Sequence, residues 1–349
     1  MAKVLMKGNE AVGKAAIEAG CRYFFGYPIT PQSEVPEYLS VELPKVGGTF
    51  VQAESEVAAI NMVYGAAAAG ARVLTSSSSP GIALKQEGIG YISNAGLPAV
   101  IINMMRGGPG LGTIQPGQAD YNMTVKGGAN GDYHNVVLAP ASVQEAVNMV
   151  MEAFDIADQY LLPVIILADG LIGQMMEPVE FNYVPRPNLP EKTWALVGHY
   201  GAERSNIKNL VIEPDECEAW NHDHFKVYDE VVKNEQAWEE YKMDDAEYAF
   251  VSYGTASRVV RTAIGYLRAE GYKVGMIRPI TIWPFPEKAF ANYINKGKKF
   301  FVVELNAGQM VNDVKLVVND NASVEFYGRL GGQIPTPVEI YNKICELYK

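Results

Sequence analysis

Cysteine is scarce in this chain: the 349 residues include three, Cys21, Cys217 and Cys345, and no two of them form a C-x-x-C pair. This spacing excludes a self-contained zinc or iron–sulfur site and suits a reducing compartment. The sequence also lacks an apolar run long enough to span a membrane, and its N-terminus lacks the apolar stretch of a signal peptide. We therefore expect a cytoplasmic protein with no metal site of its own.

An excess of positive charge is missing as well. Lysine and arginine total 29 against 40 aspartate and glutamate residues, which gives a formal net charge of -11. Such a charge argues against nucleic acid or an anionic membrane surface as the main partner. The length exceeds that at which a single hydrophobic core stops growing, so we expect two domains.

The first half of the sequence alternates strand and helix patterns. Residues 99–103 (AVIIN) and 163–168 (PVIILA) are almost entirely apolar, which is typical of strands in a parallel sheet covered on both faces. Segments with apolar residues at helical spacing separate such strands. We predict a doubly wound α/β domain over residues 1–176.

This pattern stops near residue 177. The following stretch is rich in proline and polar residues, and we predict a linker or extended arm over residues 177–245, with a charged helix near 226–243. Strands and helices then alternate again, which predicts a second, smaller doubly wound domain over residues 246–349.

Two carboxylates interrupt an alanine-rich, otherwise apolar segment, residues 51–71 (VQAESEVAAINMVYGAAAAGA). Glu54 and Glu56 are two residues apart. On a helix, which turns by about 100° per residue, they point to nearly opposite sides. If one faces solvent, the other faces the protein interior. A buried carboxylate is energetically costly unless it is paired, so such a residue calls for an explanation.

Polar loops follow several predicted strands. In residues 24–34 (FFGYPITPQSE), Thr30 lies where parallel sheets bind ligands, although capping of the next helix by Thr30 or Ser33 is the simpler interpretation. Residues 75–81 (TSSSSPG) offer amides and hydroxyls to an anion, but they lack the phosphate-loop pattern. We therefore favour a capping loop there.

Arg106 ends a buried strand and precedes a glycine-rich stretch, where it could clamp a carboxylate or, equally, form a structural ion pair. In the long connection that follows, Gln118 and Asp120 could reach a ligand. His134 could transfer a proton, although a solvated loop histidine is the simpler interpretation.

A second histidine-containing segment lies in the predicted linker. His222 and His224 are interpreted as part of a solvated surface turn rather than a metal pair, because no further ligand set is apparent.

Taken together, these segments resemble the α chain of thiamine-diphosphate-dependent 2-oxoacid:ferredoxin oxidoreductases, closest to the type acting on 3-methyl-2-oxobutanoate (2-oxoisovalerate). The resemblance implies a pyrimidine-binding domain followed by a transketolase C-terminal-like domain. It rests on residues 8–34 (GNEAVGKAAIEAGCRYFFGYPITPQSE), 52–60 (QAESEVAAI), 76–84 (SSSSPGIAL), 96–110 (GLPAVIINMMRGGPG) and 278–286 (RPITIWPFP).

The resemblance assigns roles to single residues. Glu56 matches the catalytic glutamate that contacts N1′ of the cofactor's aminopyrimidine, which leaves Glu54 at solvent or at a subunit contact. Tyr27, Pro28 and Ile29 would line the pyrimidine side of the cofactor.

Substrate binding is assigned in the same way. Thr30 and Arg106 match residues that hold the substrate carboxylate in the related pyruvate enzymes. Gln118 and Asp120 fall in the family's variable substrate loop.

The resemblance also implies that this chain supplies half of an active site. The diphosphate and metal site is usually marked by a GDG motif with a downstream asparagine, and residues 168–173 (ADGLIG) lack the second glycine in register. A β subunit would therefore carry the diphosphate and Mg site of thiamine diphosphate. Iron–sulfur clusters would lie only on partner chains of a complex with γ and ferredoxin-like δ subunits, and self-association of this chain is expected.

The expected reaction is CoA-dependent oxidative decarboxylation of 3-methyl-2-oxobutanoate to acyl-CoA and CO2, with electrons passing to ferredoxin. One alternative is the same reaction on 2-oxoglutarate or another 2-oxoacid. Residues 107–122 contain no cation for a second carboxylate, which favours an apolar substrate tail. The other alternative is a non-catalytic scaffold subunit, against which the presence of Thr30, Glu56 and Arg106 together argues.

Overall fold

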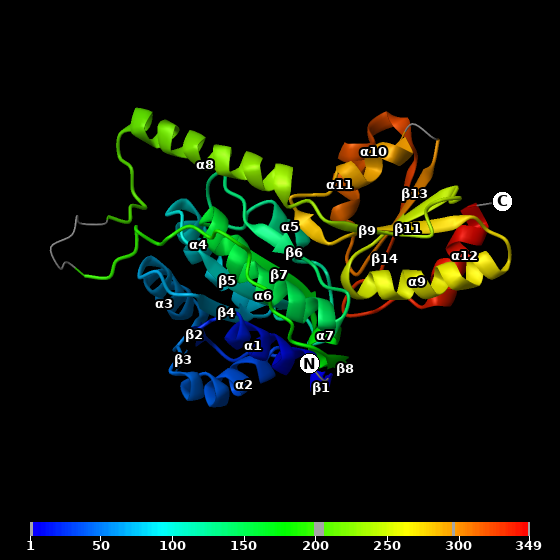
Figure 1. Cartoon of the computed structure of the whole chain (residues 1–349). Helices are drawn as coiled ribbons and strands as arrows, with labels where there is room; N and C mark the ends of the chain where they lie inside the picture. The colour runs from blue at the N-terminus through cyan, green and yellow to red at the C-terminus, as the bar shows by residue number, and fades with distance from the viewer. Residues whose placement is uncertain (1–2, 199–205, 295–296, 348–349) are drawn as a thin grey trace.

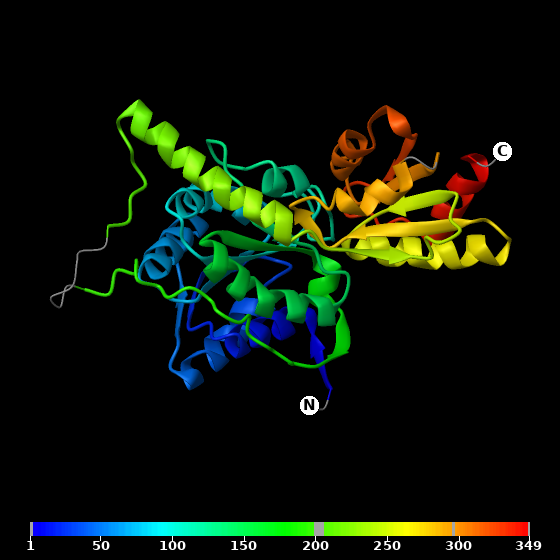
Figure 2. The same cartoon turned by 45° about the horizontal axis from the view of Figure 1, so that its top comes forward.

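The computed structural model describes residues 3–198, 206–294 and 297–347. Figure 1 shows two α/β bodies side by side, with a long helix, α8, running along the top of the larger one. Residues 206–212, which form no helix or strand, lead to the start of that helix, and the turned view of Figure 2 shows the same arrangement of the two bodies and α8.

A seven-stranded sheet forms the centre of the larger body, in the order β12-β6-β7-β5-β4-β2-β3. All neighbouring strands are parallel except β12, which pairs antiparallel with β6. The central strands are buried along their whole length, as the apolar sequence runs predict. The strands are β2 (Tyr23–Gly26), β3 (Thr49–Gln52), β4 (Val73–Ser77), β5 (Ala99–Met105), β6 (Val136–Leu138), β7 (Pro163–Asp169) and β12 (Thr281–Trp283).

Helices cover both faces of this sheet. Helices α1 (Gly8–Glu18), α2 (Glu34–Glu42) and α6 (Val143–Tyr160) share one core cluster. Helices α3 (Glu56–Ala68) and α4 (Ser79–Asn94) belong to a second cluster, which continues into the smaller body.

Shorter elements complete the larger body. They are an antiparallel pair of two strands far apart in the sequence, β1 (Val4–Lys7) and β8 (Met176–Val179), and the short helices α5 (Tyr121–Val125) and α7 (Gly170–Gln174).

The smaller body has a five-stranded sheet in the order β14-β13-β10-β11-β9, parallel except for the antiparallel edge strand β9. The predicted fold class, two doubly wound α/β sheets, is confirmed. Its strands are β9 (Trp238–Tyr241), β10 (Tyr248–Val251), β11 (Val274–Pro279), β13 (Lys299–Glu304) and β14 (Val324–Gly328); its helices are α9 (Gly254–Ala269), α10 (Lys288–Ile294), α11 (Met310–Val318) and α12 (Pro337–Leu347).

Each sheet ends on an edge strand from outside its own predicted segment. β12 follows β11 in the sequence yet pairs with β6 of the large sheet, while β9 lies in the predicted linker and pairs with β11 of the small sheet. Both edge strands are antiparallel to their neighbours.

The predicted charged helix near 226–243 is wrong in its bounds. Helix α8 covers Pro214–Asn234, and residues 238–241 form β9 instead. Pro214 and the acidic residues of the first turn favour a helix start at this point. Trp220, Tyr228 and Val231 lie on one side of the helix at helical spacing, and Trp220 Nε1 donates to Asn94 O at 3.1 Å.

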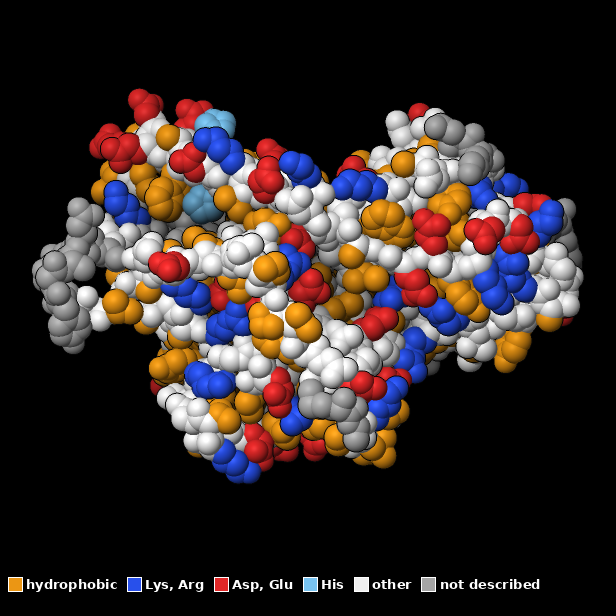
Figure 3. All heavy atoms as spheres, in the orientation of Figure 1, with side chains coloured by type: hydrophobic (Ala, Val, Ile, Leu, Met, Phe, Trp, Pro, Cys, Tyr) orange, Lys and Arg blue, Asp and Glu red, His pale blue; other side chains and the backbone are white. Residues whose placement is uncertain are grey.

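The outer side of α8 is polar. Figure 3 shows acidic side chains gathered over the start of the helix, where the first turn carries Asp215 and Glu216. Across the described parts of the chain, no helix combines the length and the apolar character that crossing a membrane requires.

Candidate active site

The loops that follow β2, β3, β4, β5 and β7 emerge at one edge of the large sheet, because these strands are parallel. The carboxyl edge of such a sheet is where α/β proteins bind ligands. The side chains described next come from these loops.

Glu56 is the first residue of α3 and is 6% exposed, whereas Glu54 is exposed. The predicted contrast in burial is confirmed, although its cause differs: Glu54 precedes the helix, and Ser55 between them caps it by accepting from Ala58 N at 3.2 Å. Among the described residues, none donates a hydrogen bond to the Glu56 carboxylate. A carboxylate buried without a donor is poised to accept a proton or a hydrogen bond from a ligand.

The start of α4 faces Glu56 across a gap that only glycine permits. A Cβ atom at Gly81 would lie 2.7 Å from Glu56 Oε1 and 2.1 Å from Ser77 Oγ. The hydroxyls of Ser77 and Ser78 are buried and have no partner, so Ser78 stands at the N-cap without making a side-chain cap bond. The favoured interpretation of residues 75–81 as a simple capping loop is therefore wrong for these two serines.

Sequence analysis missed one group in this region, Lys85 of α4. Its side chain is fully buried, and Nζ donates to Thr75 Oγ1 at 2.6 Å and to Ser76 O at 3.0 Å. Burial lowers the pKa of Lys85 to about 7, against the opposing effect of the negative charge on Glu56.

Arg106 and Thr30 are brought together, as the resemblance implies. Arg106 is 7% exposed; Nη1 donates to Thr30 O at 2.9 Å and Nη2 donates to Leu111 O at 2.9 Å. Its Nε is buried and has no partner. The guanidinium thus ties two loops together through backbone carbonyls and retains donors for an anion.

A cavity of about 480 Å³ opens beside this pair. Thr30 lines it, together with residues of the glycine-rich loop, α2 and α7, namely Pro31, Ser33, Glu34, Ile114, Gln115, Pro116, Gly170, Leu171 and Gln174. Leu111 and Ile114 of the loop are exposed apolar side chains, at 82% and 57%.

Gln118 makes contacts that the sequence does not predict. Its Nε2 donates to Tyr253 O at 3.0 Å, and its Oε1 accepts from Leu305 N at 2.9 Å. Both ends of the amide are thus bound to the smaller body, and the side chain is fully buried. These contacts join the two bodies; a role of Gln118 toward a substrate stays a prediction.

Asp120 is buried and does not line the cavity beside Thr30. It is 8% exposed, and Oδ2 accepts from Asn103 Nδ2 at 2.9 Å. Burial raises its pKa, while hydrogen bonds from Ser79 and Asn103 and the charge of Arg106 lower it. The bond to Asn103 ties Asp120 to strand β5, and its role toward a substrate stays a prediction.

Tyr27, Pro28 and Ile29 form the loop after β2, and their side chains are partly or fully exposed. Gln32 links this loop to strand β4, because its Nε2 donates to Tyr27 O at 3.4 Å and its Oε1 accepts from Ser76 Oγ at 2.5 Å. The three side chains are thus available at the carboxyl edge.

The histidines lie elsewhere. His134 precedes β6, at the opposite edge of the sheet, and stacks on Trp283 with ring centroids 4.5 Å apart. Burial lowers its pKa. The interpretation of His134 as a solvated loop residue is therefore wrong, and the residue lies away from the carboxyl edge.

His222 and His224 lie within α8, not in a turn, and His224 Nδ1 is 2.9 Å from Trp220 O. Within residues 3–198, 206–294 and 297–347, no three His, Cys, Asp or Glu side chains are grouped so that they could hold a metal ion.

The carboxylate in residues 168–173 has an observed structural role. Asp169 Oδ1 accepts from Leu171 N at 3.0 Å, and it also accepts from Thr255 Oγ1 at 2.8 Å. Asp169 therefore caps α7 and holds the start of α9 against the larger body.

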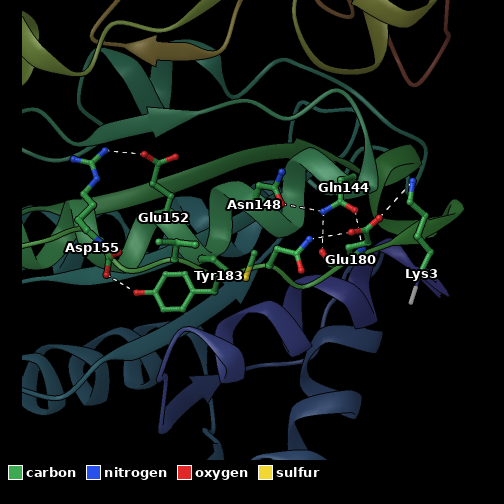
Figure 4. Close-up of a pocket in the computed structure, with 11 residues that line it drawn as sticks. Lys3, Gln144, Asn148, Glu152, Asp155, Glu180 and Tyr183 are labelled. Carbon is green, nitrogen blue, oxygen red and sulfur yellow. Dashed lines mark hydrogen bonds and ion pairs between the residues drawn. The ribbon is translucent and has the colours of Figure 1, made fainter. Parts of the chain in front are cut away.

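A second cavity of about 480 Å³ lies on the outer face of α6, under residues 180–186 (Figure 4). Its polar side chains bond to one another, as with Gln144 Nε2, which donates to Asn148 Oδ1 at 2.9 Å, and Tyr183 OH, which donates to Asp155 Oδ1 at 2.6 Å. The groups are satisfied and lie away from the carboxyl edge, so this cavity is not the candidate site.

Comparison with known proteins adds to this geometry. Residues 14–240 match the family described as pyruvate flavodoxin/ferredoxin oxidoreductase, thiamine diphosphate-binding, and residues 246–340 match pyruvate:ferredoxin oxidoreductase core domain II. The chain is 47% identical to ketoisovalerate oxidoreductase subunit VorB of Methanothermobacter thermautotrophicus, over 99% of this chain and 98% of that one. It is 36% identical to 2-oxoglutarate synthase subunit KorA of Methanothermobacter marburgensis, over 97% of each.

Among solved structures, the chain is similar to 2-oxoglutarate:ferredoxin oxidoreductase from Magnetococcus marinus, with a TM-score of 0.87 and 28% identity. The match covers 99% of this chain and 65% of that longer chain. A split-gene transketolase shares the fold alone, with a TM-score of 0.60 at 14% identity over 98% of this chain and 97% of that one.

Proposed function

The chain belongs to the pyruvate flavodoxin/ferredoxin oxidoreductase family, and from this premise we propose that it is a subunit of a ketoisovalerate oxidoreductase. The reaction is CoA-dependent oxidative decarboxylation of 3-methyl-2-oxobutanoate to acyl-CoA and CO2, with electrons passing to ferredoxin. The observation that carries the proposal is Glu56, a buried carboxylate without a donor, which faces the space left by Gly81.

These residues fit the aminopyrimidine half of thiamine diphosphate. Glu56 offers an acceptor, the missing Cβ of Gly81 leaves room beside it, and the unpartnered hydroxyls of Ser77 and Ser78 can satisfy polar ring atoms. Tyr27, Pro28 and Ile29 would line the same half. The diphosphate, its Mg ion and the iron–sulfur clusters are assigned to partner chains, because the sequence lacks a GDG motif and clustered cysteines.

When bound, thiamine diphosphate supplies the carbon nucleophile and the electron sink of the reaction. The residues of this chain control protons and charge around it. Glu56 would hold a proton against ring nitrogen N1′, in a site whose burial strengthens the hydrogen bond. Arg106 would bind the carboxylate of the oxoacid through its remaining donors, and Thr30, whose carbonyl it holds, lines the adjacent cavity.

The glycine-rich loop supports a branched, apolar substrate tail. It carries exposed Leu111 and Ile114 and no cation between residues 107 and 122. The second candidate is 2-oxoglutarate, supported by the relatives named 2-oxoglutarate synthase subunits. On that alternative a partner chain supplies the cation for the second carboxylate.

Because this chain would supply only half of the active site, the proposed function requires partner subunits. We propose a β subunit that carries the diphosphate site, γ and ferredoxin-like δ subunits, and self-association of this chain. The relatives are themselves named as subunits, which supports an assembly. The division into residues 1–176, 177–245 and 246–349 remains a proposal. Two strands depart from it: β9 of the linker pairs with the small sheet, and β12 pairs with the large sheet.

The test is CoA-dependent reduction of a low-potential dye by the complex purified through this chain, with 3-methyl-2-oxobutanoate, pyruvate and 2-oxoglutarate offered in turn. We expect the branched acid to give the highest kcat/KM, by at least about tenfold, since one methylene in an apolar pocket alone is worth about that much. The activity should disappear when thiamine diphosphate is removed. Preference for 2-oxoglutarate would contradict the proposed substrate. Inactivity of a cofactor-loaded complex with all three acids would contradict the proposed reaction.

A further inference from the structure

Two glycines of α4, Gly81 and Gly88, lie against α3, the helix that begins with Glu56. They are seven residues apart, about two helical turns, so they share one face of α4. A Cβ atom at Gly81 would lie 2.7 Å from Glu56 Oε1. One at Gly88 would lie 2.5 Å from Ile60 Cγ2 and 2.8 Å from Ile60 Cγ1. Each glycine therefore leaves a hollow in α4 that a side chain of α3 fills.

The side chains that fill the two hollows belong to one stripe of α3. Glu56 and Ile60 are one turn apart, and the buried stripe continues with Val63 and Ala67. Ile60 is 1% exposed and lies in the core cluster that both helices share. The spacing of the two helices is thus set where Ile60 meets Gly88, a residue without a side chain. In such a close-packed core, the addition of one methyl group is felt.

Glu56 depends on this packing for its place. Among the described residues, no donor holds its carboxylate, in contrast to Asp120, which accepts from Asn103 Nδ2 at 2.9 Å. What fixes the Glu56 carboxylate is the close approach of α3 to α4. A displacement of α3 by about 1 Å would take the carboxylate out of hydrogen-bond range of a ligand placed to meet it.

We propose that Gly88 is a positioning residue for Glu56: its missing side chain lets α3 lie close to α4, so that the Glu56 carboxylate stays at the hollow of Gly81, where the aminopyrimidine would meet it. The inference rests on the proposed function, because it takes Glu56 to be the residue that meets N1′. Gly88 touches no ligand itself. It acts through Ile60 and the helix that Ile60 shares with Glu56.

The key variant is G88A in the assembled complex, because the added methyl group would overlap Ile60 and push α3 away from α4. We expect the Kd of thiamine diphosphate, measured by calorimetry on the complex stripped of cofactor, to rise at least about tenfold, the effect of a lost hydrogen bond to a charged group. The Kd of inorganic diphosphate with Mg should stay within about twofold, since the proposed function assigns the diphosphate to a partner chain and distant sites are independent.

A second substitution tests the route through Ile60. I60A removes both γ-carbons and leaves the Cβ atom of position 60 at 3.2 Å from the added methyl group, a contact that a small shift relieves. The double variant G88A/I60A should therefore bind thiamine diphosphate within about threefold of the wild type, because the two substitutions compensate each other. Its thermal stability should nevertheless fall, since the core loses the packing of Ile60.

Two other glycines provide matched controls. Gly90 is buried on α4, and a Cβ atom there would lie 2.9 Å from Ala129 Cβ, on the loop rather than on α3. G90A should lower thermal stability and leave the Kd of thiamine diphosphate unchanged. Gly65 is exposed on α3 with open space around it, so G65A should change neither quantity adversely.

The contrary outcomes are distinguishable. An unchanged Kd in G88A, with E56Q binding at least about tenfold more weakly, would make Gly88 a packing residue only and leave the proposed function standing. Equal weakening of binding in G88A and G90A would contradict the inference in the same way. If G88A does not assemble, G88A/I60A carries the test, and its failure to assemble or its weakened binding would rule out the route through Ile60. Unchanged thiamine diphosphate affinity in E56Q would instead overturn the proposed role of Glu56 and the inference with it.

Discussion

Arg106 shows how one residue can serve both structure and binding. Two of its nitrogens hold the loops of Thr30 and Leu111, and its buried Nε has no partner. We predict that R106K lowers kcat/KM for the oxoacid about a hundredfold, mainly through KM. A lysine keeps the charge but loses the fork of donors, and a charge-assisted hydrogen bond contributes about 1.5–3 kcal/mol. Steady-state kinetics of the assembled complex measure the effect.

A matched control is R22K. Arg22 also donates to backbone carbonyls, those of Ile17 and Cys21, but it lies before β2, away from the carboxyl edge. Its kcat/KM should stay near wild type. If R106K loses thermal stability while KM for the oxoacid is unchanged, Arg106 is a loop clamp and not a substrate ligand.

Single residues differ in how far the sequence predicts them. The contrast between Glu54 and Glu56 was predicted from a helical spacing, but it arises because Glu54 precedes the helix that Glu56 begins. Lys85 was missed, although it stands between Ile82 and Ile89 at the spacing of a buried helical stripe, where a lysine is unusual. The contacts of Gln118 with Tyr253 and Leu305 could not be predicted, because both partners are far away in the sequence.

At the scale of elements, one of the contacts that join the two bodies depends on the Gln118 amide. Q118A would leave the buried N–H of Leu305 without an acceptor, while the carbonyl of Tyr253 would keep its second donor, Ser257 N at 3.3 Å. We predict a loss of about 1–3 kcal/mol in the free energy of unfolding, the cost of one buried unsatisfied group. KM for the oxoacid should change little. Urea denaturation and steady-state kinetics measure the two effects.

Q115A serves as the comparison, since Gln115 lies in the same loop and is exposed. It should cost less than about 0.5 kcal/mol. A variant Q118A of normal stability with a greatly raised KM would restore Gln118 as a substrate ligand.

Elements with local signals were predicted well, and those decided by tertiary pairing were not. The apolar strands β5 and β7 could be recognised from their sequences alone. Helix α8 was placed too late because the stripe of Trp220, Tyr228 and Val231 is narrow among many charged residues. Strands β9 and β12 are too short to signal which sheet receives them: β9 of the predicted linker joins the small sheet, and β12 of the second predicted domain joins the large sheet.

At the scale of the whole molecule, the acid, the arginine and the glycine-rich loop meet at one edge of the large sheet. This edge carries a buried carboxylate and unused guanidinium donors, which the proposed function assigns to an aminopyrimidine and to a substrate carboxylate. The proposed β subunit would supply the rest. Because β12 follows β11 in the sequence yet pairs with β6, the large sheet is completed by a strand from the second predicted domain.

The most direct test of this account compares E56Q with E54Q in the assembled complex. Glu54 lies two residues away and is exposed, so E54Q controls for the change of charge on the same segment. With assembly verified by gel filtration, we expect E56Q to lower the rate of oxoacid-dependent dye reduction at least about a hundredfold, the usual size of a lost acid–base group, and E54Q to stay within about twofold. An E56Q complex as active as the wild type would contradict the account.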